Sequence, residues 1–306
     1  MTILTVNHVT TYAYSKPVGL GEHRMMLRPR DSYDQRLLRA TLDIDPAPQR
    51  LRWIHDVFDN CVTLANFVGQ TRQLRVESDM TLDHTPLSGP EFLLEDHARF
   101  YPFSYDADEM PDIARAVERR HPDPSGELDR WARRFVHQGR PTETGALLMT
   151  LTYAIKEGFS YERRTEMGTQ NPLQTLARRR GSCRDFAVLM MEAARALGLA
   201  ARFVSGYLYV PDRDMGERYL GGGSTHAWCQ IYLPGAGWVE FDPTNGIVGN
   251  RDLIRVAVGR DARQAMPLSG SFFGSAADHE EMTVSVTVRQ IRDTEPSASG
   301  ARYGAT

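Results

Sequence analysis

"RRRGSCRDFAVLMMEAARALG", residues 178–198, predicts a long amphipathic helix whose first turn contains a cysteine. Apolar side chains recur along it at spacings of four, three and four residues, which places them on one buried face. They are Phe186, Met190, Ala193 and Leu197, and Gly198 ends the helix. At a helix start, unpaired backbone N–H groups and the helix dipole favour a thiolate over a thiol. The position of Cys183 therefore suits a nucleophile, although a buried cysteine is often only a small apolar side chain.

A nucleophilic cysteine needs a base within hydrogen-bond reach and a third group that orients the base. Two apolar strands further along the chain supply both residue types. The first, STHAWCQIYL at 224–233, carries His226 near its start, and the second, WVEFDPTNG at 238–246, carries Asp242. A lone histidine in an apolar strand is more often a core residue than a catalyst, so the geometry of the pair decides between the two interpretations.

The loop between those strands determines whether the two side chains meet. If the loop comprises residues 233–237, Tyr232 faces Trp238, and His226 and Asp242 become diagonal neighbours on one face of the sheet. A loop shorter by one residue would put them on opposite faces unless a bulge intervened. The register of this hairpin is therefore a geometric test of a His226–Asp242 pair.

These motifs occur together in one known family. GSCRDFAVLMMEAARALGLAARFVSGYL at 181–208 and STHAWCQIYLPGAGWVEFDPTNG at 224–246 resemble the transglutaminase-like superfamily, whose core is papain-like and whose catalytic residues follow the order Cys, His, Asp. The matching features are the glycine before the cysteine, the acidic residue two places after it, the His-Ala-Trp run and the Trp-x-x-x-Asp-Pro-Thr run. TYAYSKPVGLGEHRMMLRPRDSYDQ and FDNCVTLANF are similar to the β-rich N-terminal region of bacterial proteins with this core, and GRDARQAMPLSGSFFG is similar to their end.

The resemblance implies that Cys183 is the nucleophile, that His226 is its general base and later acid, and that Asp242 fixes the imidazole. The implied reaction is attack of a thiolate on a peptide or glutamine-type amide, which releases an amine or ammonia and leaves a thioester acyl-enzyme. An amine acceptor then gives transamidation, and water gives deamidation or proteolysis. Two alternatives stay open: a cysteine peptidase or amidase of the same fold, and a catalytically silent binding scaffold.

The surroundings of the cysteine are less determined by the sequence. Backbone N–H groups near Cys183 are expected to hold the oxyanion, and the sequence assigns the second donor to neither Gln170 nor Trp131, which both lie upstream. Asp185 suits the helix dipole by itself and could equally orient a neighbouring group. The short helix before the cysteine is predicted to end just before Gly181.

Composition argues against several classes of protein. The net charge of −3 and the pI near 6.3 disfavour a nucleic-acid partner, because phosphates demand a concentrated positive face. Three cysteines make a disulfide framework improbable. His226 and Cys229 stand three apart on a strand and point to opposite faces, so we predict no metal site, and no motif calls for a cofactor. Because no leader or long apolar run is evident, we expect a cytoplasmic protein without a membrane partner that acts on a peptide or protein amide.

The order of elements predicts an α+β fold in two parts. Residues 1–85 contain about six short strands with turn signals between them, which indicates a β-rich sandwich or barrel. Residues 86–110 are a connector, and residues 111–292 form the catalytic core, with helices first, an antiparallel sheet next and a C-terminal alternating strand last. Residues 293–306 are predicted to be a flexible tail.

Overall fold

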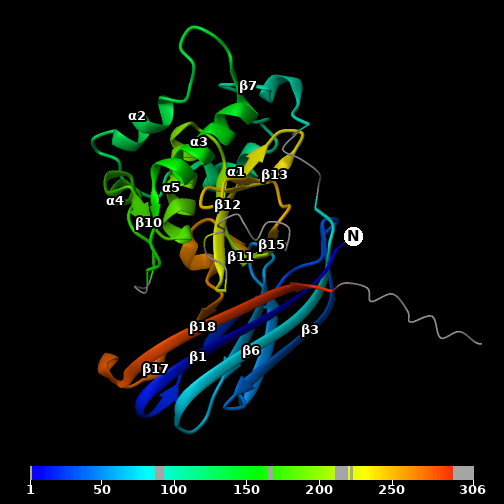
Figure 1. The fold of residues 1–306 in the computed structure, drawn as a ribbon, viewed down its shortest axis with the longest axis vertical. Coiled ribbons are helices and arrows are strands. Elements are labelled where there is room, and N and C mark those ends of the chain that lie inside the picture. The colour runs from blue at the N-terminus through cyan, green and yellow to red at the C-terminus, as the bar shows by residue number, and fades with distance from the viewer. Residues whose placement is uncertain (1, 87–92, 165–167, 211–219, 221–222, 292–306) are drawn as a thin grey trace, which may run out of the picture.

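The structure is a computed structural model that describes residues 2–86, 93–164, 168–210, 220 and 223–291. Helices gather at one end of the molecule and long strands lie at the other (Figure 1). The predicted α+β class is confirmed by this arrangement and by the antiparallel pairing within the large sheets. The predicted tail at 293–306 lies outside the described residues.

The amino-terminal part is a sandwich of two sheets. Its strands are β1 (Thr2–Leu20), β2 (His23–Arg28), β3 (Gln35–Asp45), β4 (Arg50–His55), β5 (Cys61–Asn66) and β6 (Thr71–His84). Three strands from the end of the chain complete the sheets: β16 (Leu268–Ser269), β17 (Phe272–Phe273) and β18 (His279–Gln290). One sheet has the order β17-β1-β6-β3, and the other has the order β16-β2-β5-β4. The six strands predicted in this region are therefore present, and a shared apolar core joins the two sheets.

The alternating strand near the end of the chain belongs to this sandwich. β18 pairs antiparallel with β1, from Leu4 opposite Gln290 to Tyr14 opposite His279. The prediction that grouped this strand with the core, within residues 111–292, is therefore wrong. Strict alternation shows that a strand has one buried face, but it does not say which sheet lies beside that strand.

The core contains a second antiparallel sheet, in the order β14-β13-β12-β11-β15. Its strands are β11 (Ala201–Leu208), β12 (His226–Leu233), β13 (Gly237–Asp242), β14 (Ile247–Val248) and β15 (Leu253–Gly259). The helices are α1 (Met110–Val117), α2 (Glu127–Arg133), α3 (Thr144–Gly158), α4 (Pro172–Arg178) and α5 (Cys183–Ala196). There are also two short strand pairs. β7 (Phe100–Tyr101) pairs with β8 (Thr142–Glu143), and β9 (Ser160–Tyr161) pairs with β10 (Arg180–Gly181). Across the described ranges, no helix has the length and apolar character needed to cross a membrane.

Helix α5 lies at the centre of the core and packs on β12 and β11. The sequence predicted one buried face, but burial extends around most of the helix. Its internal charges are compensated: Glu192 is fully buried and forms an ion pair with Arg195 at 2.8 Å. Glu192 also accepts hydrogen bonds from the backbone N–H groups of Arg120 and His121. Buried charges are tolerated when they are paired in this way.

The sandwich and the core share buried apolar contacts. Leu4 and Val6 of β1 belong to one buried cluster with Tyr207 of β11 and Ile254 of β15. The described part of the predicted connector is also packed down, since the Tyr105 hydroxyl donates to the carbonyl of Tyr232 at 3.0 Å. The boundary near residue 85 therefore separates two sequence regions, while the packing between them is continuous.

The end of α4 differs from the prediction. The helix ends at Arg178, and Arg179 adopts the left-handed conformation at φ 49°, a place that glycine commonly fills. Gly181 stands two residues later, in β10. Gly181 is therefore not the helix cap, and a side chain at this position would instead collide with Asp185.

Candidate active site

The β12–β13 hairpin has the predicted register. Tyr232 lies opposite Trp238, and Leu233 lies opposite Gly237. This register brings His226 and Asp242 together on one face, with Nε2 of the imidazole 2.8 Å from Oδ2 of the carboxylate. Both side chains are fully buried. The geometric test posed by the loop length is therefore met.

The carboxylate of Asp242 is held by two further donors. The backbone N–H of Thr244 donates to Oδ1 at 2.9 Å, and Nδ2 of Asn245 donates to Oδ2 at 2.9 Å. Burial acts to raise the pKa of the Asp242 carboxyl, but the neighbouring imidazole and the hydrogen bonds outweigh it and hold that pKa below its usual value. Asp242 is therefore an ionised group with a fixed orientation.

The pKa of the His226 imidazole is set by burial, by Asp242 and by Cys183. Burial lowers the pKa of His226, but Asp242 and the Cys183 thiol act more strongly in the other direction and raise it to about 10. Nε2 is occupied by Asp242, and the buried Nδ1 has no hydrogen bond of ordinary geometry to the described atoms. Nδ1 is thus the ring nitrogen that Asp242 leaves unoccupied.

Cys183 is the first residue of α5 and is 6% exposed. The first backbone N–H groups of a helix have no partner within the helix, and the helix dipole favours negative charge there. The thiol of Cys183 therefore lies beside the imidazole of His226, at the N-terminus of α5.

Asp185 holds the segments around this cysteine in place. Its fully buried carboxylate accepts from the Ser182 backbone N–H at 2.8 Å, from the Gln170 backbone N–H at 2.6 Å and from Nη1 of Arg164 at 2.8 Å. Burial acts to raise the pKa of this carboxyl, but those hydrogen bonds keep it below the usual value. The sequence left Asp185 between a dipole role and an orienting role, and the contacts favour the second.

Gly181 is required by this arrangement. A Cβ atom at residue 181 would lie 2.9 Å from Cβ of Asp185 and 3.3 Å from Nε2 of Gln170. Such distances leave no room for a methyl group unless the carboxylate moves. The glycine before the cysteine thus permits the close approach of Asp185 to the turn that precedes α5.

The two upstream residues weighed as oxyanion donors have other partners. Nε2 of Gln170 lies 3.3 Å from Oδ2 of Asp185 and 3.4 Å from the carbonyl of Arg180. Trp131 is a core residue whose ring packs edge-on against Phe159. The backbone N–H groups at the start of α5 remain as donors without partners within the helix.

Asn245 is a site residue that the sequence analysis missed. Its Nδ2 donates to Asp242, and its side chain also accepts from the Leu220 backbone N–H at 2.8 Å and donates to the Leu220 carbonyl at 3.2 Å. Asparagine in a Thr-Asn-Gly run is an ordinary turn residue, so the run alone does not indicate this role.

The other two cysteines differ from Cys183. Cys229 is fully buried, and Sγ lies 3.5 Å from the carbonyl of Phe241. Burial raises the pKa of the Cys229 thiol far above its usual value, and it raises the pKa of the half-buried Cys61 as well. All three cysteines are free. Among the described residues, no three His, Cys, Asp or Glu side chains are grouped as metal ligands would be.

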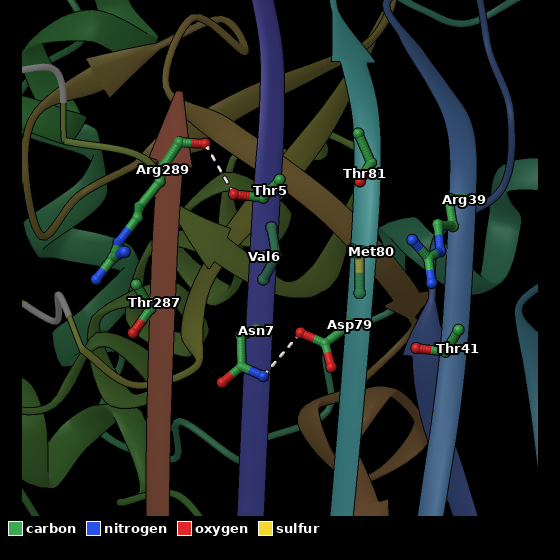
Figure 2. A pocket seen from close by; sticks show the side chains of 10 residues that line it. All are labelled: Thr5, Val6, Asn7, Arg39, Thr41, Asp79, Met80, Thr81, Thr287 and Arg289. Carbon is green, nitrogen blue, oxygen red and sulfur yellow. Dashed lines mark hydrogen bonds between the residues drawn. The ribbon is translucent and has the colours of Figure 1, made fainter. Parts of the chain in front are cut away.

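A hollow of about 530 Å³ lies elsewhere, on the face of the β1–β6–β3 sheet that is turned away from the core (Figure 2). Its lining includes Thr5, Asn7, Arg39, Thr41, Asp79 and Thr81. Within it, Asn7 already donates to Asp79 at 2.8 Å. The hollow holds none of the predicted site residues, so the candidate active site is the buried group at the start of α5.

Comparison with known proteins identifies a family whose model covers the residues of the candidate active site. The model for the bacterial transglutaminase-like N-terminal region matches residues 4–83, and the model for the transglutaminase-like superfamily matches residues 129–243, which contain Cys183, His226 and Asp242. The uncharacterized protein Rv2569c of Mycobacterium tuberculosis is 31% identical over 301 residues, which cover 92% of this chain and 91% of that protein. The chain belongs to the transglutaminase-like superfamily.

Other proteins are similar to this transglutaminase-like chain over nearly its whole length. The uncharacterized protein ML0607 of Mycobacterium leprae is 26% identical, with 93% of this chain and 98% of that protein covered. In structure, the chain is similar to a crystal structure described as a "Putative Cysteine Protease from Cytophaga hutchinsonii", with a TM-score of 0.71 and 20% identity. That match covers 96% of this chain and 92% of the other. It shows that the fold is shared over both the sandwich and the core.

Proposed function

We propose that this transglutaminase-like protein is a thiol enzyme that attacks a peptide or glutamine-type amide and forms a thioester acyl-enzyme. The observation that carries the proposal is the 2.8 Å contact of His226 Nε2 with Asp242, which leaves Nδ1 for the thiol of Cys183 at the start of α5. This arrangement supplies a nucleophile, a base and a group that orients the base.

The first half of the reaction is acylation. The Cys183 thiolate attacks the amide carbon, a C–S bond forms, and the oxyanion is held by backbone N–H at the start of α5. Nδ1 of His226 then gives its proton to the leaving nitrogen, the C–N bond breaks, and an amine or ammonia departs. Asp242 keeps the imidazole in position and stabilises its charge throughout.

The second half transfers the acyl group. Neutral His226 takes a proton from an amine or a water molecule, which attacks the thioester carbon, and the C–S bond breaks to restore the Cys183 thiolate. An amine gives a new amide, and water gives an acid. The product depends on which acceptor reaches the thioester. If only water reaches it, the protein is a cysteine peptidase or amidase.

A direct test is the reactivity of the three cysteines. At a pH near 6, iodoacetamide should label Cys183 much faster than Cys61 or Cys229, because the thiolate is the reactive form. His226→Gln should remove most of that difference. Slow and equal labelling of all three cysteines would instead support the catalytically silent scaffold.

The reaction itself is tested with a library of glutamine-containing peptides, with and without a primary amine. Products are read by mass for the wild type and for Cys183→Ala. Amine adducts indicate transamidation, a gain of about one dalton indicates deamidation, and fragments indicate proteolysis. Products that form equally with Cys183→Ala would contradict the assignment of the nucleophile.

A further inference from the structure

The indole of Trp228 lies beside the imidazole of His226. The centroids of the two rings are 6.0 Å apart and the ring planes make an angle of 29°, so the rings are stacked. The two residues stand two apart on β12, which puts both side chains on the same face of the sheet. Both are buried, with exposures of 0% for Trp228 and 1% for His226. The imidazole therefore has an aromatic ring as a buried neighbour.

Gly206 makes room for this contact. In β11 it lies opposite His226, and Val204 lies opposite Trp228. A Cβ atom at residue 206 would lie 2.8 Å from Cη2 of Trp228 and 2.0 Å from the carbonyl oxygen of Ile254. The far edge of the indole thus reaches the residue that faces His226. A side chain at residue 206 would displace the indole, so the glycine permits the stacking.

Hydrogen bonding does not explain a tryptophan at this position. Nε1 of Trp228 is buried and has no hydrogen-bond partner among the described atoms. The indole belongs to an apolar cluster with Val204, Leu208 and Leu253. A buried N–H without a partner costs free energy that a leucine or a phenylalanine would avoid. The contact with His226 is therefore the interaction that only an aromatic ring supplies here.

The face of an indole attracts a cation, because the ring carries partial negative charge above its plane. This attraction is strongest where water is excluded, as it is around His226 and Trp228. A neutral imidazole gains less from the same neighbour. The stacked indole therefore favours the imidazolium form of His226 over the neutral form.

Few other titratable groups face the imidazole. β13 contributes the carboxylate of Asp242, α5 contributes the thiol of Cys183, and β11 contributes a glycine. The Tyr161 phenol of β9 stays neutral, because burial and the nearby Cys183 raise its pKa to about 12. Asp242 binds Nε2 within the ring plane, whereas a stacked indole lies against the face of the ring. The carboxylate and the indole thus act on different parts of the imidazole.

We propose that Trp228 is a positioning residue that stabilises the imidazolium form of His226 and so keeps the Cys183 proton on Nδ1 before substrate binds. The proton moves from Sγ to Nδ1, which leaves a thiolate and an imidazolium, and no other bond changes. Trp228 acts through the imidazole and needs no contact with the substrate. The inference rests on the proposed function, since it concerns the same nucleophile and base.

Fluorinated tryptophans at residue 228 test this role with little change in packing. Each added fluorine withdraws electron density from the ring face, while the shape stays close to that of tryptophan. Nitrogen NMR of the histidine rings follows the titration of His226, and His226→Gln identifies its signals. The pKa of His226 is raised to about 10 in the folded protein. We expect the pH at which His226 loses its proton to fall step by step with fluorination, by about one pH unit in total.

Substitutions give a second comparison. Trp228→Phe should retain most of the wild-type titration, because a ring face remains, and Trp228→Leu should lower the midpoint by about one pH unit. Trp131→Leu is the matched control. Trp131 is also a buried tryptophan, but its ring packs edge-on against Phe135 and Phe159. Its loss should leave the titration of His226 unchanged.

The two proposals fail in different ways. If iodoacetamide labels Cys183 as slowly as Cys61 and Cys229, the proposed function is wrong, whatever the titration of His226 shows. If Cys183 reacts fast but His226 titrates at the same pH at every degree of fluorination, the role of Trp228 is wrong. An equal shift in Trp131→Leu would also overturn that role, because it would mark a general effect of a weakened core. If Trp228→Leu does not fold, the fluorinated proteins still decide, since they keep the indole.

Discussion

Nδ2 of Asn245 donates to the same oxygen of Asp242, Oδ2, that accepts the hydrogen bond from His226 Nε2. One carboxylate oxygen thus joins the imidazole to a side chain that also holds the backbone of Leu220 through two hydrogen bonds. The orientation of the imidazole therefore depends on a turn residue beyond the end of β13.

Asn245→Ala should lower the rate at which iodoacetamide alkylates Cys183 by about tenfold, because Asp242 loses a donor and the imidazole loses part of its orientation. Asn245→Asp should be worse, since it places a second carboxylate against Asp242. The pH profile of iodoacetamide labelling measures both effects. A wild-type profile for Asn245→Asp would show that Asn245 only holds Leu220.

Asp185→Asn should destabilise the protein by about 3 kcal/mol, because it leaves Arg164 without its buried partner and turns an amide N–H toward backbone donors. Urea unfolding gives the free energy of unfolding. The matched control is Asp129→Asn, which breaks an exposed pair with Arg133 and should cost less than about 1 kcal/mol. Equal losses in the two variants would remove Asp185 from its supporting role.

Protonation of His226 should make stability depend on pH. The folded pKa of His226 is raised to about 10, so the folded state keeps a proton that the unfolded chain releases above a pKa of about 6.5. The stabilisation is complete below the unfolded pKa and is lost as pH rises toward about 10, by at most about 1.4 kcal/mol per pH unit. Relative to His226→Gln, the wild type should therefore lose unfolding free energy across that window. Parallel curves for the two proteins would contradict the raised pKa.

Gly181→Ala should destabilise the protein by about 1–3 kcal/mol and slow the labelling of Cys183, because the new methyl group displaces Asp185. Gly158→Ala is the control. A Cβ there would meet only the end of the Arg179 side chain at 3.8 Å, so the change should be close to neutral. Thermal unfolding and iodoacetamide labelling of both variants provide the comparison.

Local rules account for what the sequence predicted correctly. The β12–β13 register followed from one loop length and the two-residue period of a strand, and the strand count in residues 1–85 followed from turn signals. Asp185 and Asn245 were not assigned their roles, because each has an adequate local reason to occur, at a helix start or in a turn. Their partners Gln170, Arg164 and Leu220 are brought in by folding.

The position of Arg179 shows a second limit. A glycine two residues later suggested where α4 ends, yet the left-handed residue is an arginine whose guanidinium lies 5.9 Å from the ring centre of Phe159. A conformation that costs an arginine some free energy is accepted where surrounding contacts fix it. Such compensation is not visible in a sequence pattern.

The pairing of β18 with β1 sets an order on folding during synthesis. β1 is translated before β6 and can pair with it early, but its other edge stays open until β18, which follows the core in the chain, has been translated. During that interval α5, β12 and β13 are already outside the ribosome and can assemble. The nascent protein can therefore assemble its candidate active site while the β1–β6–β3 sheet, which packs against the core, still has an unpaired edge.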